Sequence, residues 1–145
     1  MTWKNVPIPE TIVFPLILGF VLEYIFPKQL FPSQAIWLVL ALLLFVFGVI
    51  LIIWSVKEAG IRDLASPDTL ITTGPYSISR NPMYVSWISI YLSIFFVNRS
   101  IWLILQFIIA FVLTHYFVVF REERFLREKF GDIFEAYCNK VRRYL

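Results

Sequence analysis

The sequence predicts an all-α membrane protein with four transmembrane helices followed by a C-terminal amphipathic helix. Of its 145 residues, 59% are hydrophobic and 19% are aromatic, whereas an ordinary soluble domain is about 45–50% apolar. Only 16% are charged, against about 25% in soluble domains. A chain of this length has too little interior to bury so much apolar surface. These values exclude a disordered chain, a collagen, a disulfide scaffold and an ordinary soluble enzyme, and the length favours one domain over residues 1–145.

Four apolar runs account for the predicted spans. A transmembrane helix needs about 20 apolar residues to cross about 30 Å of hydrocarbon. Two runs meet this length without an Asp, Glu, Lys or Arg. A first, shorter run contains one acid, Glu23, and gains length if it begins near Ile8. A third run is short and is joined to the fourth by a tight turn, which predicts a helical hairpin. In chain order the predicted spans are residues 12–26, 33–55, 82–97 and 100–120.

The basic residues predict how these spans are oriented. With four spans, the N-terminal segment, the loop 56–81 and the C-terminal tail lie on one side of the membrane and contain eleven Lys and Arg residues, including Lys4 and Arg62; the other side contains two, Lys28 and Arg99. Because cytoplasmic segments are enriched in Lys and Arg, both termini are expected in the cytoplasm. The first run lacks a small-residue cleavage site, so we expect a transmembrane helix there and not a signal peptide.

The loop 56–81 ends in a polar segment with several turn and helix-start signals. Gly74-Pro75 is typical of a turn, Asn81 suits a helix N-cap, and Pro82 suits the first helical turn. One interpretation is that this segment is only a well-formed helix start. The other is that it carries chemistry, because the predicted topology brings it to the same membrane face as the tail.

The tail, residues 121–141, is amphipathic. Its apolar side chains recur every three or four residues, at Leu126, Phe130, Ile133, Phe134, Tyr137 and Val141. Glu122 and Glu123 extend this stripe, and in an α-helix His115 and Tyr116 lie two turns before them on nearly the same line. Acids at the end of a span are costly unless they are paired or bind a ligand. Both options stay open, and the partners available for ion pairs are Arg80, Arg121 and Arg124.

Other residue patterns predict little chemistry. The single cysteine, Cys138, has no disulfide partner, and no Cys/His cluster predicts a zinc site. Motifs of nucleotide-binding folds, zinc proteases and α/β-hydrolases are absent from the sequence. Gly19 and Gly48 are expected to be helix-packing positions, and Glu23 lies close enough to a helix end to reach the membrane interface.

Two blocks of residues resemble the isoprenylcysteine carboxyl methyltransferase family. These are integral-membrane methyltransferases that use S-adenosylmethionine, and the related phospholipid methyltransferases share the pattern. The first block is Gly74-Pro75-Tyr76 with Arg80-Asn81-Pro82-Met83-Tyr84. The second is Glu122-Glu123 with Leu126, Phe130-Gly131, Tyr137 and Val141. The family's motif has His at Asn81 and Gly at Ser86, and its eukaryotic members have Arg at Val118.

The resemblance implies a catalytic half over residues 68–143, in which the loop and the tail helix cap a cofactor pocket; residues 1–55 add two spans without a family motif. It implies S-adenosylmethionine as the cofactor and no metal. The implied cofactor-binding residues are Asp68, Thr69, Leu70, Ile71, Tyr76, Arg80, Asn81, Pro82, Met83, Tyr84, Glu122 and Glu123. The candidate catalytic residues are Glu122, Arg121 and His115.

The expected activity is methyl transfer to a lipophilic acceptor taken from the bilayer, with an isoprenylcysteine carboxylate as the first candidate. A carboxylate is ionised near neutral pH and needs no base, whereas an amine or a thiol must lose a proton, which His115 or Glu122 would accept. The alternatives are phospholipid N-methylation, small-thiol methylation, and a non-enzymatic membrane module with the same fold. No nucleic-acid partner is expected.

Overall fold

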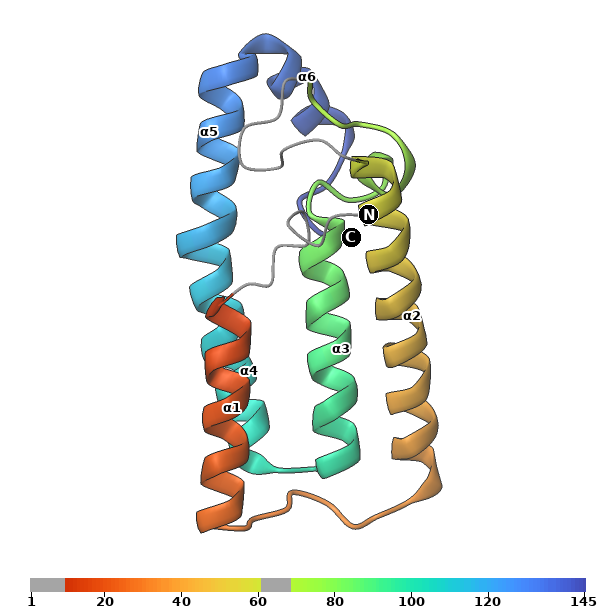
Figure 1. Ribbon diagram of the computed structural model, residues 1–145, viewed down its shortest axis with the longest axis vertical. Helices are drawn as coiled ribbons and strands as arrows, with labels where there is room; N and C mark the ends of the chain where they lie inside the picture. The colour runs from red at the N-terminus through yellow and green to blue at the C-terminus, as the bar shows by residue number, and fades with distance from the viewer. Residues whose placement is uncertain (1–9, 61–68) are drawn as a thin grey trace.

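The computed structural model describes residues 10–60 and 69–145, and this part of the chain forms helices and no strand. Four helices, α1 to α4, run alternately up and down, and α5 extends beyond the other helices at the end where α6 packs (Figure 1). A 3₁₀-helix, η2, precedes α3, and a π-helix, η3, connects α4 to α5. The bounds are α1 Glu10–Ile25, α2 Ala35–Ala59, η2 Gly74–Ser77, α3 Pro82–Asn98, α4 Ile101–Leu113, η3 Thr114–Val119, α5 Phe120–Phe130 and α6 Asp132–Lys140.

The helices pack as two pairs, α2 against α3 and α1 against α4, while α3 and α4 contact each other much less (Figure 1). Small residues allow these close approaches. A Cβ atom at Gly48 of α2 would lie 2.9 Å from the carbonyl oxygen of Ser86 in α3, and one at Gly19 of α1 would lie 2.8 Å from the Leu103 side chain in α4. Both glycines are therefore packing positions, as the sequence predicted.

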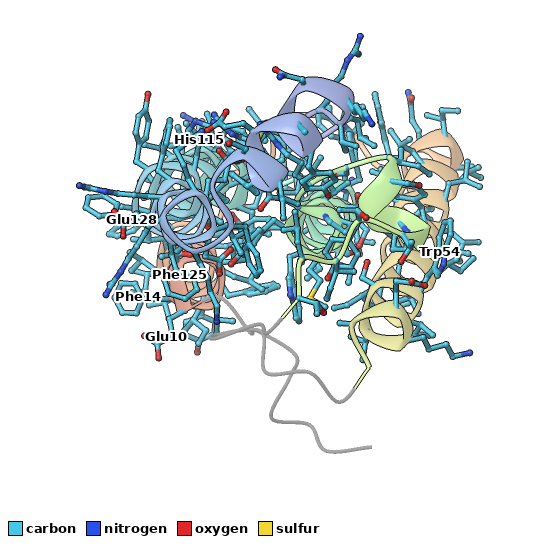
Figure 2. All side chains as sticks on the ribbon, turned by 90° about the horizontal axis from the view of Figure 1, so that it is seen from above. Glu10, Phe14, Trp54, His115, Phe125 and Glu128 are labelled. Atoms are coloured by element: carbon cyan, nitrogen blue, oxygen red, sulfur yellow. The ribbon has the colours of Figure 1, made fainter. Side chains whose placement is uncertain are left out.

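Within residues 10–60 and 69–145, two helices are long and apolar enough to cross a membrane: α2, and the continuous helix Ile101–Phe130 formed by α4, η3 and α5. Large apolar side chains also project outward. Phe14 on α1 is 70% exposed and Trp54 on α2 is 44% exposed, and they lie at opposite sides of the molecule (Figure 2). Since water disfavours such a surface and a lipid bilayer does not, this is a membrane protein.

The two connections at the end opposite α6 are joined by hydrogen bonds. The hydroxyl of Ser100, the N-cap of α4, donates to the Glu23 carboxylate at 2.6 Å. The backbone N–H of Leu30 donates to the Arg99 carbonyl at 2.9 Å, and that of Ile101 to the Lys28 carbonyl at 3.0 Å. Glu23 is therefore paired near the helix end, where the sequence indicated it would reach the interface.

The four apolar runs are confirmed as helices, but the expected single tail helix over residues 121–141 is wrong. Its first half continues α4 without a break. Its second half is a separate helix, because Gly131 adopts a positive φ of 50° between α5 and α6. Glycine reaches this conformation at little cost and most other residues do not. The possible extension to Ile8 and the basic residues Lys4 and Arg62 lie outside the described residues.

Candidate functional site

The loop before α3 and the C-terminal tail meet at one end of the helix pairs, as the sequence predicted. The Arg80 backbone N–H donates to the carbonyl of Arg142 at 2.9 Å. The Tyr137 hydroxyl in α6 donates to the carbonyl of Tyr76 in η2 at 2.6 Å. Around these bonds, Phe134, Tyr137 and Val141 form a buried apolar cluster. Segments about 60 residues apart in sequence thus form one structural unit.

The Gly74-Pro75-Tyr76 turn is held against the end of α2 by Glu58. The Thr73 hydroxyl donates a short hydrogen bond to the Glu58 carboxylate. Gly74 has a φ of 58°, and a Cβ there would lie 2.7 Å from the Glu58 carboxylate. A glycine is thus needed both for the backbone conformation and for the approach of Glu58. Sequence reasoning missed Glu58, because its contact depends on how the loop folds back.

Asn81 lies at the start of α3, but its side chain does not cap the helix. Pro82 occupies the first turn as predicted. The Asn81 side-chain amide instead donates to the carbonyl of Arg143 in the tail at 3.1 Å. Asn81 therefore connects the loop to the tail, a contact that helix-capping rules do not predict.

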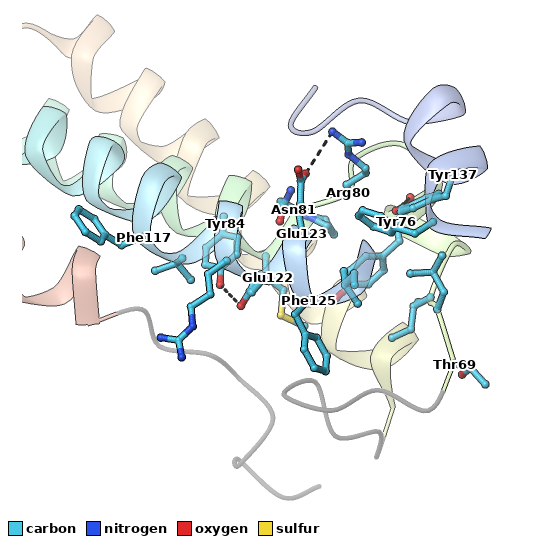
Figure 3. Close-up of a pocket in the computed structure, with 18 residues that line it drawn as sticks. Thr69, Tyr76, Arg80, Asn81, Tyr84, Phe117, Glu122, Glu123, Phe125 and Tyr137 are labelled. Carbon is cyan, nitrogen blue, oxygen red and sulfur yellow. Dashed lines mark hydrogen bonds and ion pairs between the residues drawn. The ribbon is translucent and has the colours of Figure 1, made fainter. Parts of the chain in front are cut away.

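Glu122 and Glu123 have different partners although they are adjacent in α5. Glu123 is 4% exposed and forms ion pairs with Arg143 at 2.7 Å and with Arg80 at 3.3 Å. Glu122 accepts a hydrogen bond from the Tyr84 hydroxyl at 2.8 Å (Figure 3). Of the two options for these acids, ion pairing or ligand binding, ion pairing therefore holds for Glu123. Glu122 forms no salt bridge with any described residue.

A cavity of about 540 Å³ lies between the loop, the start of α3, the helix η3–α5 and α6 (Figure 3). Its lining contains the predicted site residues Thr69, Leu70, Ile71, Tyr76, Arg80, Asn81, Pro82, Met83, Tyr84, Arg121, Glu122 and Glu123. Asp68 lies outside the described residues. The lining also contains Phe117, Val118, Phe125, Leu126, Phe134 and Tyr137. Phe117 lies four residues before Arg121 and Phe125 four residues after it, and this spacing is the signal that sequence reasoning did not use.

His115 does not line this cavity. Its Nδ1 atom lies 2.7 Å from the hydroxyl of Tyr144 in the tail. The reason is the π-helix, in which the Phe120 N–H bonds to the carbonyl of His115 five residues earlier. One extra residue in a helical turn rotates the flanking residues by about 100° relative to each other. His115 and Glu122 therefore contact different segments, contrary to the alignment expected for a regular α-helix, and the catalytic role of His115 stays a prediction.

The phenols and arginines in and near the cavity differ in whether they are free to bind a ligand. Burial raises the pKa of Tyr137 to about 12, and burial likewise raises the pKa of Tyr76. Both phenols therefore stay protonated near neutral pH. Arg124 pairs with Glu128 at 3.2 Å, whereas Arg121 has no ion-pair partner in the part of the chain that the structure describes. The described residues contain no cluster suited to a metal ion.

Helical packing, an apolar outer surface and a cavity lined by the Glu122 carboxylate define an α-helical membrane protein with a polar site at one end. A sequence model of the phospholipid methyltransferase family matches residues 36–133. The chain therefore belongs to this family, within the isoprenylcysteine carboxyl methyltransferase-like group of membrane methyltransferases. Such methyltransferases generally use S-adenosylmethionine. No curated protein and no solved structure matches the chain.

Replacing Gly74 by alanine tests the contact between the turn and α2. We expect Gly74→Ala to lose stability from its positive φ, at about 1–2 kcal/mol, and in addition to displace Glu58 from Thr73. Gly60→Ala is the control, because Gly60 also has a positive φ but no atom of the described residues lies within 4 Å of the position its Cβ would take. Thermal unfolding in detergent should show a larger loss for Gly74→Ala. Equal losses in the two variants would contradict the role of Glu58.

Proposed function

We propose that the protein is an integral-membrane, S-adenosylmethionine-dependent methyltransferase that acts on a lipophilic acceptor bearing an anionic group. An isoprenylcysteine carboxylate is the first candidate for this acceptor. The observation that carries the proposal is Glu122, a carboxylate without an ionic partner among the described residues. It lines the cavity of a chain that belongs to a methyltransferase family.

The cavity suits this cofactor in size and chemistry. Its volume of about 540 Å³ falls in the range of small-molecule sites, about 300–1,000 Å³. Glu122 offers a carboxylate for an ammonium, a sulfonium or ribose hydroxyls, and Ile71 and Met83 offer apolar surface for a purine ring. When bound, S-adenosylmethionine supplies an electrophilic methyl group on a sulfonium.

In this proposal the protein residues orient the reactants. Tyr84 donates to Glu122 at 2.8 Å and fixes the direction of the carboxylate. Tyr76 and Tyr137 provide aromatic walls, and the protonated Tyr76 hydroxyl is a hydrogen-bond donor for a reactant. Orientation alone contributes about 7–11 kcal/mol in favourable cases, so no further catalytic group is required for an ionised acceptor.

Arg121 is the residue we assign to the acceptor. It lines the cavity without an ion pair to a described residue, between Phe117 and Phe125 at steps of four residues. A guanidinium in a cavity whose lining also contains these two aromatic residues suits an anionic group attached to an apolar chain. This arrangement supports an acceptor carboxylate, although Val118 stands where eukaryotic relatives have Arg.

Phospholipid N-methylation is the second candidate, favoured by the description of the family whose sequence model matches. In this reaction Arg121 binds the lipid phosphate, and the amine transfers a proton to Glu122 before it is methylated. Small-thiol methylation needs the same base. A non-enzymatic module is the remaining alternative, and Asn81 in place of the family's His is the feature that favours it.

We also propose four membrane spans, α1 to α4, with both termini and the site on the cytoplasmic side. The alternating directions of these helices and the eleven-to-two distribution of Lys and Arg support this topology. It gives a polar cofactor access from the cytoplasm and a lipophilic acceptor access from the bilayer.

Glu122→Gln tests the cofactor site. The amide still accepts the hydrogen bond from Tyr84 but lacks the charge, so affinity for S-adenosylhomocysteine should fall by about 1.5–3 kcal/mol, measured by calorimetric titration. Glu128→Gln, at an exposed position of the same helix, should bind like the wild type. If folded wild-type protein does not bind, the proposed function is wrong. If the wild type binds and Glu122→Gln binds with the same affinity, Glu122 is not in the site.

Arg121→Gln tests the acceptor. Methyl transfer from radiolabelled cofactor should be measured with a prenylcysteine, with phosphatidylethanolamine vesicles and with small thiols. We expect transfer to the prenylcysteine, and an acceptor KM about tenfold higher in Arg121→Gln, since a charge-assisted hydrogen bond is lost. Arg124→Gln serves as the control because Arg124 pairs with Glu128. Transfer only to phosphatidylethanolamine would select the second candidate, and transfer only to thiols would exclude both lipids.

Cysteine labelling tests the topology. In a Cys138→Ser background, Lys28→Cys and Lys57→Cys lie at opposite ends of the helices and are exposed. We expect a membrane-impermeant thiol reagent to label Lys28→Cys in intact cells, and Lys57→Cys only after the membrane is permeabilised. Labelling of both from the same side would refute the four-span arrangement.

A further inference from the structure

The last five residues, 141–145, have no regular secondary structure, yet they contact every segment that surrounds the cavity. Val141 is buried in the apolar cluster with Phe134 and Tyr137. The carbonyl of Arg142 accepts from the Arg80 N–H at 2.9 Å. The Tyr144 hydroxyl lies 2.7 Å from His115 in η3. These contacts define the C-terminal tail segment as a component of the site and not as a free end.

Arg143 makes the most contacts within this segment. Its Nε and Nη2 atoms donate to the two carboxylate oxygens of Glu123 at 3.0 and 2.7 Å, a paired geometry that only Arg provides. Its guanidinium lies 4.7 Å from the ring centroid of Phe120. Its carbonyl accepts from the Asn81 side chain at 3.1 Å and from the Ser79 hydroxyl at 3.3 Å.

Arg143 itself does not line the cavity, but two of its partners, Asn81 and Glu123, do. Arg80, which pairs with Glu123, is also a lining residue. Without Arg143, the buried Glu123 carboxylate would keep only the 3.3 Å contact with Arg80. An incompletely paired buried charge is costly, so Arg80 would move toward Glu123 and away from its present place in the wall. Asn81 would also lose its partner if the tail segment came away.

We infer that Arg143 is a positioning residue for the proposed cofactor site, and that it acts through Glu123, Arg80 and Asn81. This inference rests on the proposed function. It assigns the C-terminal tail segment a part in cofactor affinity, in addition to any contribution to folding.

The experiment compares Arg143→Gln with Arg142→Gln. Both changes remove one positive charge from adjacent tail positions, but the Arg142 side chain is exposed and has no ion pair or hydrogen bond with a described residue. We expect Arg143→Gln to weaken S-adenosylhomocysteine binding about tenfold to a hundredfold, as for a misplaced binding group. In the transfer assay the KM for the cofactor should rise, whereas the KM for the acceptor should not. A purely structural role would lower the amount of active protein and leave both KM values unchanged.

A double variant separates an indirect from a direct role. If Arg143 acts through Glu123, adding Glu123→Gln to Arg143→Gln removes the stranded buried charge, so binding should be no weaker than in Arg143→Gln alone. Strictly additive losses would overturn the inference. If Arg143→Gln does not fold, Arg143→Lys replaces it in the comparison, since Lys retains the charge without the paired geometry. If the wild type binds S-adenosylhomocysteine and the Arg142 and Arg143 variants bind it with equal affinity, this inference is overturned but the proposed function stays intact. If the folded wild type does not bind, both are overturned.

Discussion

The site depends on the ion pairs of the buried Glu123 carboxylate with Arg80 and Arg143. This carboxylate joins three segments that are distant in sequence: α5 through its own backbone, the loop before α3 through Arg80, and the tail through Arg143. A buried carboxylate without partners is strongly destabilising, whereas one with two guanidinium groups is compensated. The three segments therefore form together, and the cavity exists only in the arrangement that satisfies this charge.

The helix packing provides the frame for that cluster. Gly48 against Ser86 and Gly19 against Leu103 allow α2 and α3, and α1 and α4, to approach closely. In a lipid environment such contacts matter, because apolar burial provides little drive for helix association and close packing must supply it. The position of the start of α3, and hence of Asn81, follows from this packing.

Some charged side chains around the cavity pair with each other, and others have no ionic partner among the described residues. Glu123 and Arg143 pair with each other and hold the walls together. Glu122 and Arg121 face the same cavity without an ionic partner among the described residues, so one carboxylate and one guanidinium stay available for ligands. Adjacent residues on one helix thus have opposite tasks, and the π-helix η3 sets their direction by adding a residue to the turn before them.

The sequence by itself determined the helices and the motif-bearing segments, because apolar run length and Pro82 act locally along the chain. It predicted twelve of the eighteen lining residues as site residues, most of them in or next to the two motif blocks. Two features were decided only by the tertiary structure: the separation of His115 from Glu122, and the choice of Glu123 over Glu122 as the paired acid. Periodicity assumes a regular helix, and a buried charge selects its partners from whichever segments folding brings within reach. Those choices depend on contacts between distant residues, which no local pattern contains.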